Sequence, residues 1–484
     1  MTLTLRDAQK QTLARLMHTP RMLDRSQAGT GKTAPACVYT RYVVKHLNKR
    51  VIWIQPTSLI NKNQSELLAW TGLHESEIVK LVGTKAKKLE VLADTKAKVF
   101  LCTAEGFADY ILNYWPDLKG SNVFAIICDE PHMYYRGYNS KRTQKFDTLC
   151  QRRADIEVKF LTATPTPYGK LTSAYIYCRV IEPMFYKTYR FFQGTHEVTD
   201  TFGSVINWQN HEILNALLYR NSICHTSRQV YGEVEEYIVR DTVDLSGEHE
   251  KVYRQFEQEG VLELQESIDM GSAPAQATLR CRQILNHPHK IRIPVGWDAS
   301  GQAVDFQHLD LIGQKATAKE ERLASYMAEG NPVAIFAPFT FEQERIKIHL
   351  EKLGFRGGLI NGSVSSVERN QVDTEFRAGN LDFVVASPKT AGTGFNWAHL
   401  DIIIFHSMDY GDDDFTQAVA RAKRGVRPNP LRIVILEYRD TIEQLMLVKV
   451  RANSINSNKV SAECPVLTFP RMKESDLEVK TYAK

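Results

Sequence analysis

The 484-residue sequence has no long apolar run, and this lack excludes several classes of protein. No stretch reaches the roughly 18 consecutive apolar residues that a membrane-spanning helix requires. The residues at the start, 1–7, contain no apolar region of the kind found in secretory signals, so no such signal is expected. Low-complexity segments and short repeats are also missing, which favours ordinary folded domains.

Cysteine pairs of the metal-binding kind are missing as well. The eight cysteines are scattered and form no C-x-x-C pair, so the sequence indicates neither a zinc site nor a disulfide framework. Cys102 and Cys128 lie within apolar runs, where buried thiols are expected. The net charge of +5 is compatible with a polyanionic partner but does not require one, because binding depends on a localised basic groove.

Short apolar runs of Val, Ile and Phe are present in both halves of the chain. They show no two-residue alternation, which is typical of strands buried on both faces of a parallel sheet. The eight runs are 51–54, 99–102, 124–128, 158–161, 333–336, 383–386, 402–405 and 433–436. The pattern predicts an α/β fold with two lobes, each a parallel sheet flanked by helices.

The stretch between the two sets of runs has a different pattern, with long amphipathic segments such as 248–268 and an aromatic-rich segment at 182–192. We expect a mainly helical connection there, with the aromatic residues more often in a core than stacked on bases. The predicted domains are a first lobe at 1–170, the connection at 171–315, a second lobe at 316–450 and a C-terminal tail at 451–484.

A phosphate-binding loop is the strongest single motif. Its glycines allow several N–H groups to converge on phosphate oxygens, Lys32 would reach the β- and γ-phosphates, and the Thr33 hydroxyl would ligate Mg²⁺. The other expected ATP-binding residues are Ala28, Gly29, Thr30 and Gly31. The pattern departs from G-x-x-x-x-G-K-T at Ser26, and Met22 and Leu23 are a poor strand signal, so a chance Gly-Lys-Thr stays open.

A pair of carboxylates supports the loop. Asp129 and Glu130 end the apolar run at 124–128, at the edge where a doubly wound sheet binds its ligand. Asp129 would hold Mg²⁺ through its water shell, and Glu130 would polarise the attacking water. In isolation an Asp-Glu pair is typical of a solvated strand end, but here it follows a phosphate loop by about 100 residues.

Together with further motifs, the phosphate loop and the carboxylate pair make the chain resemble the superfamily-two helicases, and within them the Swi/Snf-type double-stranded-DNA translocases. The matching segments are collinear from about Leu5 to Glu443. In the first half they are 5–9, 54–59, 102–105 and 161–165, and in the second half 279–288, 333–340, 360–364, 387–397, 417–424 and 441–443. The block at 279–288, LRCRQILNHP, most separates this family from RNA helicases.

The resemblance implies two RecA-like lobes, DNA-dependent hydrolysis of ATP with Mg²⁺, and specific roles for residues. Gln9 would read adenine, and Gly394 would belong to the nucleotide site. Arg421 and Arg424 would act as arginine fingers, with Gln417 near the γ-phosphate. Backbone contacts to nucleic acid are expected from Pro56, Thr57, Thr103, Thr340, Gly362, Ser387 and Thr393, which position a strand without reading its sequence.

Several positions depart from the family pattern. The acidic box ends in Pro131 and His132, Ala163 and Ala391 replace glycines, and Lys423 replaces a histidine. No aromatic residue precedes the adenine-reading segment, and no chromatin-reading module is visible. The sequence therefore predicts a minimal, divergent motor, which would be DNA-associated in the cytoplasm, or nuclear in a eukaryote.

Three functions stay open. The favoured one is a translocase on duplex DNA, with single strands or RNA as alternative tracks. The second is a strand-separating or branch-migrating helicase, although the sequence identifies no wedge hairpin. The third is an ATP-gated binding module or the motor subunit of a restriction system, but no nuclease motif is visible. A monomer would suffice for activity, a protein partner stays open, and no membrane partner is expected.

Overall fold

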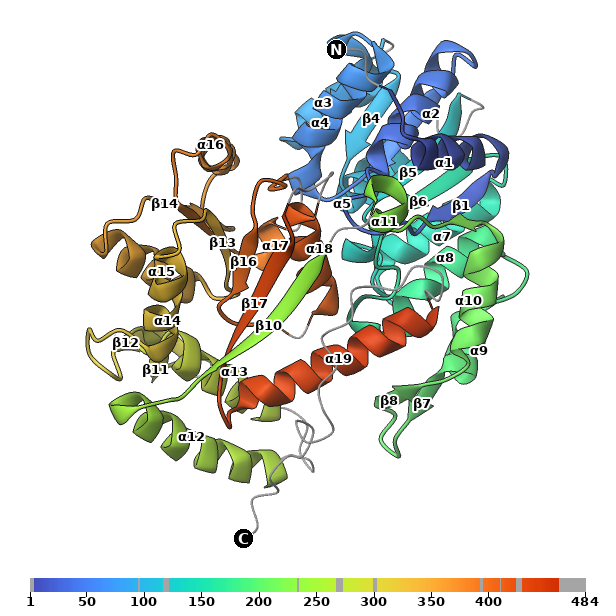
Figure 1. The fold of residues 1–484 in the computed structure, drawn as a ribbon. Coiled ribbons are helices and arrows are strands. Elements are labelled where there is room, and N and C mark those ends of the chain that lie inside the picture. The colour runs from blue at the N-terminus through green and yellow to red at the C-terminus, as the bar shows by residue number, and fades with distance from the viewer. Residues whose placement is uncertain are drawn as a thin grey trace. The chain divides into compact units, whose positions relative to one another are not determined.

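The computed structural model describes residues 4–94, 96–115, 122–232, 235–266, 273–298, 303–391, 395–409, 411–423 and 429–460. The chain divides into two compact units, the first mainly Met1–Glu233 and the second mainly Val234–Tyr410 with Gln417–Val450. Each unit contains one large sheet in which every strand pair is parallel (Figure 1). The predicted α/β architecture of two RecA-like lobes is therefore confirmed.

The sheet of the first unit has seven strands in the order β3-β4-β2-β5-β6-β1-β9. In chain order these strands are β1 (Arg21–Asp24), β2 (Arg50–Ile54), β3 (Ile78–Lys80), β4 (Val99–Cys102), β5 (Val123–Asp129), β6 (Glu157–Leu161) and β9 (Ser222–Ile223). The helices are α1 (Asp7–His18), α2 (Thr33–Lys45), α3 (Ile60–Thr71), α4 (Lys85–Ala93), α5 (Ala104–Gly106), α6 (Leu112–Tyr114), α7 (Lys141–Arg152), α8 (Ala174–Ile181), α9 (Tyr189–His196), α10 (His211–Arg220) and α11 (Ser227–Tyr231).

Alternate residues of these strands enter two different cores. On one side, Val51 and Trp53 of β2 pack with apolar residues of α1, α2 and α3. On the other side, Ile52 and Ile54 pack with residues of α7 and α8. Helices thus cover both faces of the sheet, which is why the strands read as continuous apolar runs.

The sheet of the second unit has six strands in the order β10-β17-β16-β13-β15-β14. They are β10 (Glu236–Val243), β13 (Val333–Phe336), β14 (Gly357–Ile360), β15 (Phe383–Ala386), β16 (Ile402–Phe405) and β17 (Leu431–Tyr438). The helices in this half of the chain are α12 (Gly247–Glu266), α13 (Ala273–Asn286), α14 (Ala318–Met327), α15 (Thr340–Lys352), α16 (Ser366–Arg377), α17 (Pro388–Ala391), α18 (Asp412–Ala422) and α19 (Ile442–Val460).

The predicted connection at 171–315 contains helices, and it also contains strands that the sequence analysis did not predict. β9 joins the first sheet and β10 joins the second, so the segment is shared between the two units. It also holds two antiparallel hairpins, β7 (Glu197–Thr199) with β8 (Val205–Trp208), and β11 (Ile291–Trp297) with β12 (Ala303–Leu309). The predicted domain boundaries themselves stay a prediction.

The aromatic-rich segment is divided between core and surface. Tyr186 and Phe192 are fully buried, and Tyr189 packs against the same core. Phe185 and Phe191 are exposed. None of the seven cysteines that the structure describes forms a disulfide bond. None of the helices in the described part of the chain is long and apolar enough to span a membrane.

Candidate nucleotide and nucleic-acid site

The phosphate loop lies between the carboxyl end of β1 and the start of α2, the context that the motif requires. Gly29 and Gly31 have φ angles of 83° and 81°, a region that favours glycine. A Cβ atom at Gly31 would also lie 2.6 Å from Nε2 of Gln9. The loop therefore needs glycine at both positions, and at Gly31 for two independent reasons.

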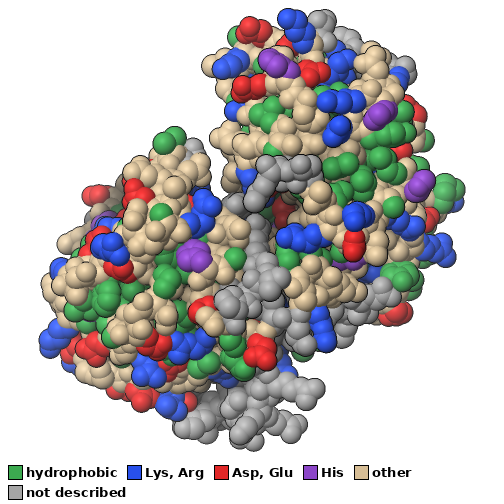
Figure 2. All heavy atoms as spheres, turned by 45° about the horizontal axis from the view of Figure 1, so that its top comes forward, with side chains coloured by type: hydrophobic (Ala, Val, Ile, Leu, Met, Phe, Trp, Pro, Cys, Tyr) green, Lys and Arg blue, Asp and Glu red, His purple; other side chains and the backbone are tan. Residues whose placement is uncertain are grey.

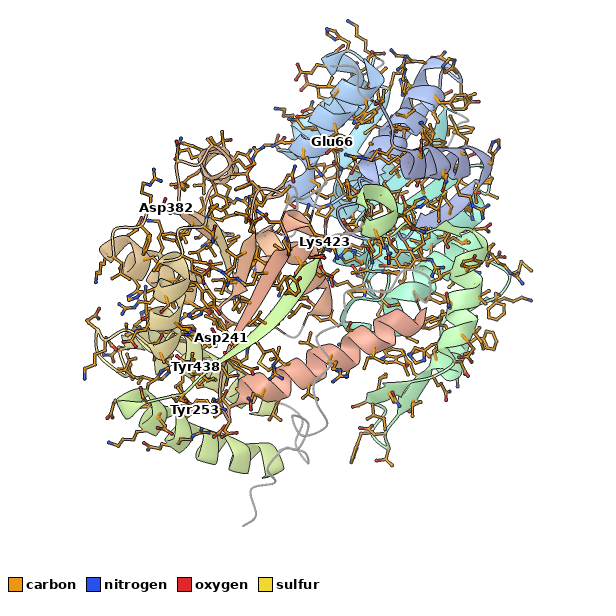
Figure 3. All side chains as sticks on the ribbon, viewed as in Figure 1. Glu66, Asp241, Tyr253, Asp382, Lys423 and Tyr438 are labelled. Atoms are coloured by element: carbon orange, nitrogen blue, oxygen red, sulfur yellow. The ribbon has the colours of Figure 1, made fainter. Side chains whose placement is uncertain are left out.

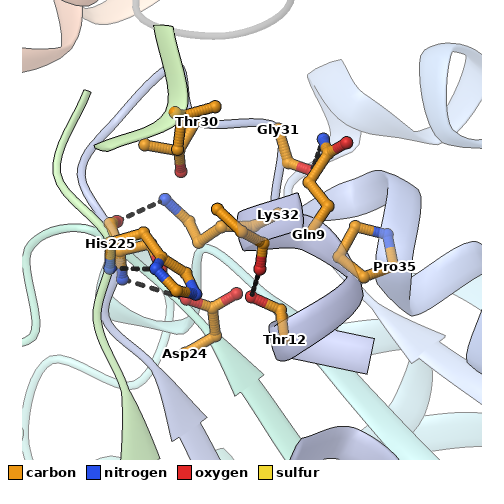
Figure 4. Close-up of a pocket in the computed structure, with 11 residues that line it drawn as sticks. Gln9, Thr12, Asp24, Thr30, Gly31, Lys32, Pro35 and His225 are labelled. Atoms are coloured by element: carbon orange, nitrogen blue, oxygen red, sulfur yellow. Dashed lines mark hydrogen bonds between the residues drawn. The ribbon is translucent and has the colours of Figure 1, made fainter. Parts of the chain in front are cut away.

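Gln9 connects α1 to this loop. Its Nε2 donates to the carbonyl of Gly31 at 3.1 Å, and its Oε1 accepts from the backbone N–H of Arg6 at 3.0 Å. The side chain is buried and lines the pocket beside the loop (Figure 4). Gln9 thus holds the loop in place, whereas its role in reading adenine stays a prediction.

Lys32 donates to two carbonyls of its own loop. Its Nζ lies 2.8 Å from the oxygen of Ser26, a hydrogen bond drawn in Figure 4, and 3.2 Å from the oxygen of Gln27. Thr30 is buried and its hydroxyl donates to the carbonyl of Gln27 at 2.8 Å, while Ala28 is also buried. Bound phosphates would compete with these carbonyls for the Lys32 ammonium.

Ser26, which departs from the loop pattern, has a structural role. Its hydroxyl accepts from the backbone N–H of His225 at 3.0 Å, and its own N–H donates to Asp24 at 2.9 Å. The described residues with positive φ do not include Ser26, so this position does not need glycine. Where the motif has a glycine, this serine instead forms a side-chain hydrogen bond with the backbone of His225.

The segment from β9 to α11 encloses the loop, and the sequence analysis missed it. The N–H of Gln27 donates to the His225 carbonyl at 2.9 Å, and the Gln27 side chain accepts from the N–H of Ser227 at 2.8 Å. The Tyr231 hydroxyl donates to the Gly29 carbonyl at 2.7 Å. The only sequence signal for this contact is the polar residue at position 26.

The carboxylate of Asp129 is buried at the end of β5. Asn63 Nδ2 donates to it at 2.8 Å and also donates to Gln55 at 2.5 Å. Burial, followed by the neighbouring charge of Glu130, raises the pKa of Asp129 to about 6. A buried carboxylate beside a second one is a favourable place for a cation.

Glu130 adopts a left-handed conformation with φ of 50°, which turns it sharply out of β5. Its Oε2 lies 3.2 Å from Nδ1 of His132, and the same nitrogen lies 2.7 Å from the hydroxyl of Thr162. His132 is almost fully buried. The departure from the family at position 132 thus joins the acidic box to the Thr162–Thr164 segment.

The order of the first sheet brings the ATP-binding elements together. β6 lies between β5 and β1, so that Asp24 and Asp129 are both in register with Leu161. The phosphate loop, the acidic box and Thr162 therefore follow adjacent strands at one sheet edge. Thr33 begins α2 there, and a Mg²⁺ ion bound with the nucleotide would be held by Thr33 and Asp129. The described residues contain no group of three or more metal-ligating side chains.

Predicted nucleic-acid contacts in the first unit also share a sheet edge. Pro56 and Thr57 follow β2, and Thr103 follows β4, which pairs with β2 through Ile54 and Cys102. Thr57 is exposed. The Thr103 hydroxyl already accepts from the N–H of Gly106 at 3.0 Å, so it caps a short helix.

The second unit repeats this arrangement. Thr340, Gly362 and Ser387 follow β13, β14 and β15. The last residues of β13 and β14 are both in register with Ala386, the last residue of β15. Thr340 and Gly362 are exposed and Ser387 is half-buried. Thr393, Gly394 and Arg424 lie outside the described residues.

Two of the predicted catalytic residues, Gln417 and Arg421, lie on α18. Gln417 and Arg421 are one helical turn apart and both are buried. The Arg421 carbonyl accepts from the N–H of Trp397 at 2.9 Å. Lys423 follows the helix and forms an ion pair at 2.8 Å with Glu236 of β10 (Figure 3).

The family-typical blocks at 279–288 and 441–443 contact each other through a buried lysine. Lys319 Nζ donates to Asn286 at 3.0 Å and to Glu443 at 2.7 Å. Asn286 also donates to Glu443 at 3.0 Å, and Glu443 accepts from the N–H of Tyr438 at 2.9 Å. These blocks therefore join α13, α14 and α19 inside the second unit, a role that their sequences did not reveal.

Two family models match the chain, one in each of its two halves. The DEAD/DEAH box helicase model matches residues 6–171, and the helicase conserved C-terminal domain model matches residues 318–426. The chain belongs to the superfamily-two helicase-like ATPases. It is an ATP-hydrolysing enzyme, and the resemblance to Swi/Snf-type proteins is confirmed by its sequence relatives.

Those relatives are distant. A chromodomain-helicase-DNA-binding protein 1-like from Danio rerio is 29% identical over 140 residues, which cover 29% of this chain and 14% of the relative. The SWI/SNF chromatin-remodeling complex subunit snf22 of Schizosaccharomyces pombe is 22% identical over 446 residues, covering 88% and 26%. The chain thus matches about a quarter or less of the length of these two curated relatives.

A solved structure shares the fold of this helicase-like ATPase. The helicase domain of Pyrococcus furiosus Hef superposes with a TM-score of 0.54 at 17% identity. The match covers 91% of this chain and 97% of that one. At this identity the likeness extends to the two-sheet architecture of the chain and carries no information about its substrate.

Proposed function

We propose that this helicase-like ATPase is a motor that translocates on double-stranded DNA and uses ATP hydrolysis to track along it, remodel it or displace bound proteins. The observation that carries the proposal is the common position of the predicted contacts. In each sheet they follow the carboxyl ends of adjacent strands, and in the first unit the phosphate loop follows the same edge. The DNA-binding and remodelling proteins among its relatives also support it.

The chemistry proposed for the first unit is attack of water on the γ-phosphate of ATP, with release of ADP and phosphate. Lys32 would bind the β- and γ-phosphates in place of the loop carbonyls that it now contacts. Glu130 would accept hydrogen bonding from the attacking water, while His132 holds the Glu130 carboxylate. Mg²⁺ would supply charge neutralisation between the phosphates when bound by Thr33 and Asp129.

A strand-separating helicase is the second candidate, and one observation favours it. The β7–β8 hairpin carries Phe202 in its turn, with 91% of that residue exposed. Apolar side chains of this kind can insert between base steps and partly unstack them. The sequence does not reveal this hairpin, because its strands are only three and four residues long.

The test is steady-state ATP hydrolysis without nucleic acid and with single-stranded DNA, duplex DNA or duplex RNA. Lys32→Ala serves as the blank, because it removes the ammonium that would bind the phosphates. We expect strong stimulation by duplex DNA and none in the blank. Stimulation by single strands or RNA alone would reject duplex tracking in favour of a helicase. A rate near zero throughout would favour an ATP-gated binding module.

A further inference from the structure

The β11–β12 hairpin of the second unit presents a face rich in basic and aromatic side chains. Arg292 of β11 is directly opposite His308 of β12 in the antiparallel register. The Arg292 guanidinium lies 3.6 Å from the ring centre of Phe306, which is two residues from His308. Since side chains alternate along the regularly paired part of β12, Phe306 and His308 both lie on this face.

The face continues onto the start of α15. Lys290, immediately before β11, places Nζ 4.0 Å from the ring centre of Phe341. The His308 ring packs edge-on against the same phenylalanine at 5.4 Å. Phe341 is adjacent to Thr340, an expected backbone contact. We name the set Lys290, Arg292, Phe306, His308 and Phe341 the hairpin face.

The acidic residues that the structure describes on the hairpin do not pair with Lys290 or Arg292. Asp305 is the only acidic residue within the two strands, and its Oδ1 accepts from the backbone N–H of Phe306 at 2.9 Å. Asp310 follows β12 and accepts a hydrogen bond from Gln314 at 3.1 Å. Among the residues that the structure describes, neither Lys290 nor Arg292 forms an ion pair with an acidic residue. By contrast, Figure 2 shows basic and acidic side chains interspersed over the face of the molecule in view.

The other side of the hairpin attaches it to the unit. Ile291 is 2% exposed and belongs to an apolar cluster with Cys281, Ile284 and Leu285 of α13. Arg280 of α13 donates to the backbone carbonyl of Arg292 at 2.8 Å. The cations at the base of the hairpin are therefore supported by a helix that also carries the family-typical block.

We infer that the hairpin face binds the sugar–phosphate backbone of duplex DNA and extends the track beyond Thr340. The inference rests on the proposed function. Positive charge that is not paired with a carboxylate complements phosphates. Proteins specialised for single strands instead offer aromatic faces on which bases stack. Here Arg292 covers one face of Phe306 and Lys290 covers one face of Phe341, which favours contact with phosphates.

The experiment compares the double variant Lys290→Gln/Arg292→Gln with wild type in duplex-DNA binding across a range of salt concentrations. The matched control is Lys347→Gln/Lys352→Gln, which removes the same charge from the far end of α15. Each lost phosphate contact should reduce the magnitude of the negative slope of log K against log salt by about 0.9. The double variant should therefore have a slope smaller in magnitude by about 1.8. Its affinity should fall by roughly tenfold at physiological salt, while the control keeps the wild-type slope.

A charge-preserving variant, Lys290→Arg, should keep the wild-type slope, and cooperative unfolding of every variant shows that the fold is intact. If wild type binds duplex DNA and the double variant has the slope of the control, the hairpin inference is wrong while the proposed function stands. If wild type does not bind duplex DNA, both are overturned. An equal reduction of the slope in the double variant and in the control would show a general charge effect, and it would also reject the inference that the hairpin face binds DNA.

Discussion

At the residue scale, Asp129 combines the cost of a buried charge with a predicted role in catalysis. Its pKa of about 6 lies above the ordinary value of 3.8, so the folded state holds the proton more tightly than the unfolded chain. This destabilisation is absent below about pH 4 and is complete once the pH has risen through about 6. A shift of this size corresponds to at most about 3 kcal/mol.

We therefore expect Asp129→Asn to unfold at a higher temperature than wild type at pH 7.5, with the difference disappearing toward pH 4. ATP hydrolysis should fall roughly 10- to 100-fold, because the group that is predicted to hold the Mg²⁺ water shell is lost. Asp382→Asn is a control in which the pKa of the replaced carboxyl group is lowered and not raised. Arg356 lowers the pKa of Asp382, which is labelled in Figure 3. Replacing the Asp382 carboxylate should therefore destabilise the folded state slightly at neutral pH. A variant less stable than wild type at pH 7.5 would contradict the argument for Asp129.

At the element scale, the phosphate loop depends on close contact between Gly31 and Gln9. Gly31→Ala would meet both a positive φ of 81° and the Gln9 amide at 2.6 Å. Gly203→Ala meets a φ of 83° with open space around it. Both changes should therefore cost about 1–2 kcal/mol in backbone strain, whereas Gly31→Ala alone should weaken ATP binding. Denaturation and nucleotide titration separate the two effects, and unchanged ATP affinity in Gly31→Ala would show that the loop tolerates the contact.

The sequence predicted the strands that form a continuous apolar run, and it missed strands that lack one, such as β10 and β14. All eight predicted runs lie within strands, because strands buried on both faces need continuous Val, Ile and Phe. β14 begins with Gly357 and Gly358, which are poor strand formers. A Cβ atom at either position would overlap Phe383 or Val372, at 2.0 and 2.4 Å, so packing requires glycine there. No local pattern reveals such a requirement.

The candidate ATP site divides in the same way. Lys32, Asp129 and Glu130 were predicted from their motifs, since the chemistry restricts the residue types and their spacing, and their roles stay a prediction. His225 and Tyr231, which contact the loop, are about 200 residues away from it in sequence and belong to no recognised motif. His132 was noted only as a departure, although it contacts Glu130 and Thr162. Contacts between distant segments leave no periodic signal in a single sequence.

At the scale of the whole molecule, the proposed motor requires that the second unit acts on the nucleotide bound by the first. The resemblance assigns this action to Arg421 of α18, a buried arginine. A guanidinium that stabilises the transferring phosphoryl group contributes roughly 10³ to 10⁵ in rate. Nucleotide affinity should depend much less on it, because the phosphate loop belongs entirely to the first unit.

We accordingly expect Arg421→Ala to lower kcat by roughly 1,000-fold or more, with ATP affinity within a few-fold of wild type. Arg421→Lys should restore little, since an ammonium lacks the planar fork of donors. Single-turnover hydrolysis together with nucleotide titration separates the rate from binding, and thermal unfolding shows whether removal of a buried side chain disturbs α18. Hydrolysis within tenfold of wild type would exclude Arg421 as the arginine finger. A parallel loss of ATP affinity would instead indicate that Arg421 acts on binding, so that only the selective loss of rate supports a motor whose two units cooperate in hydrolysis.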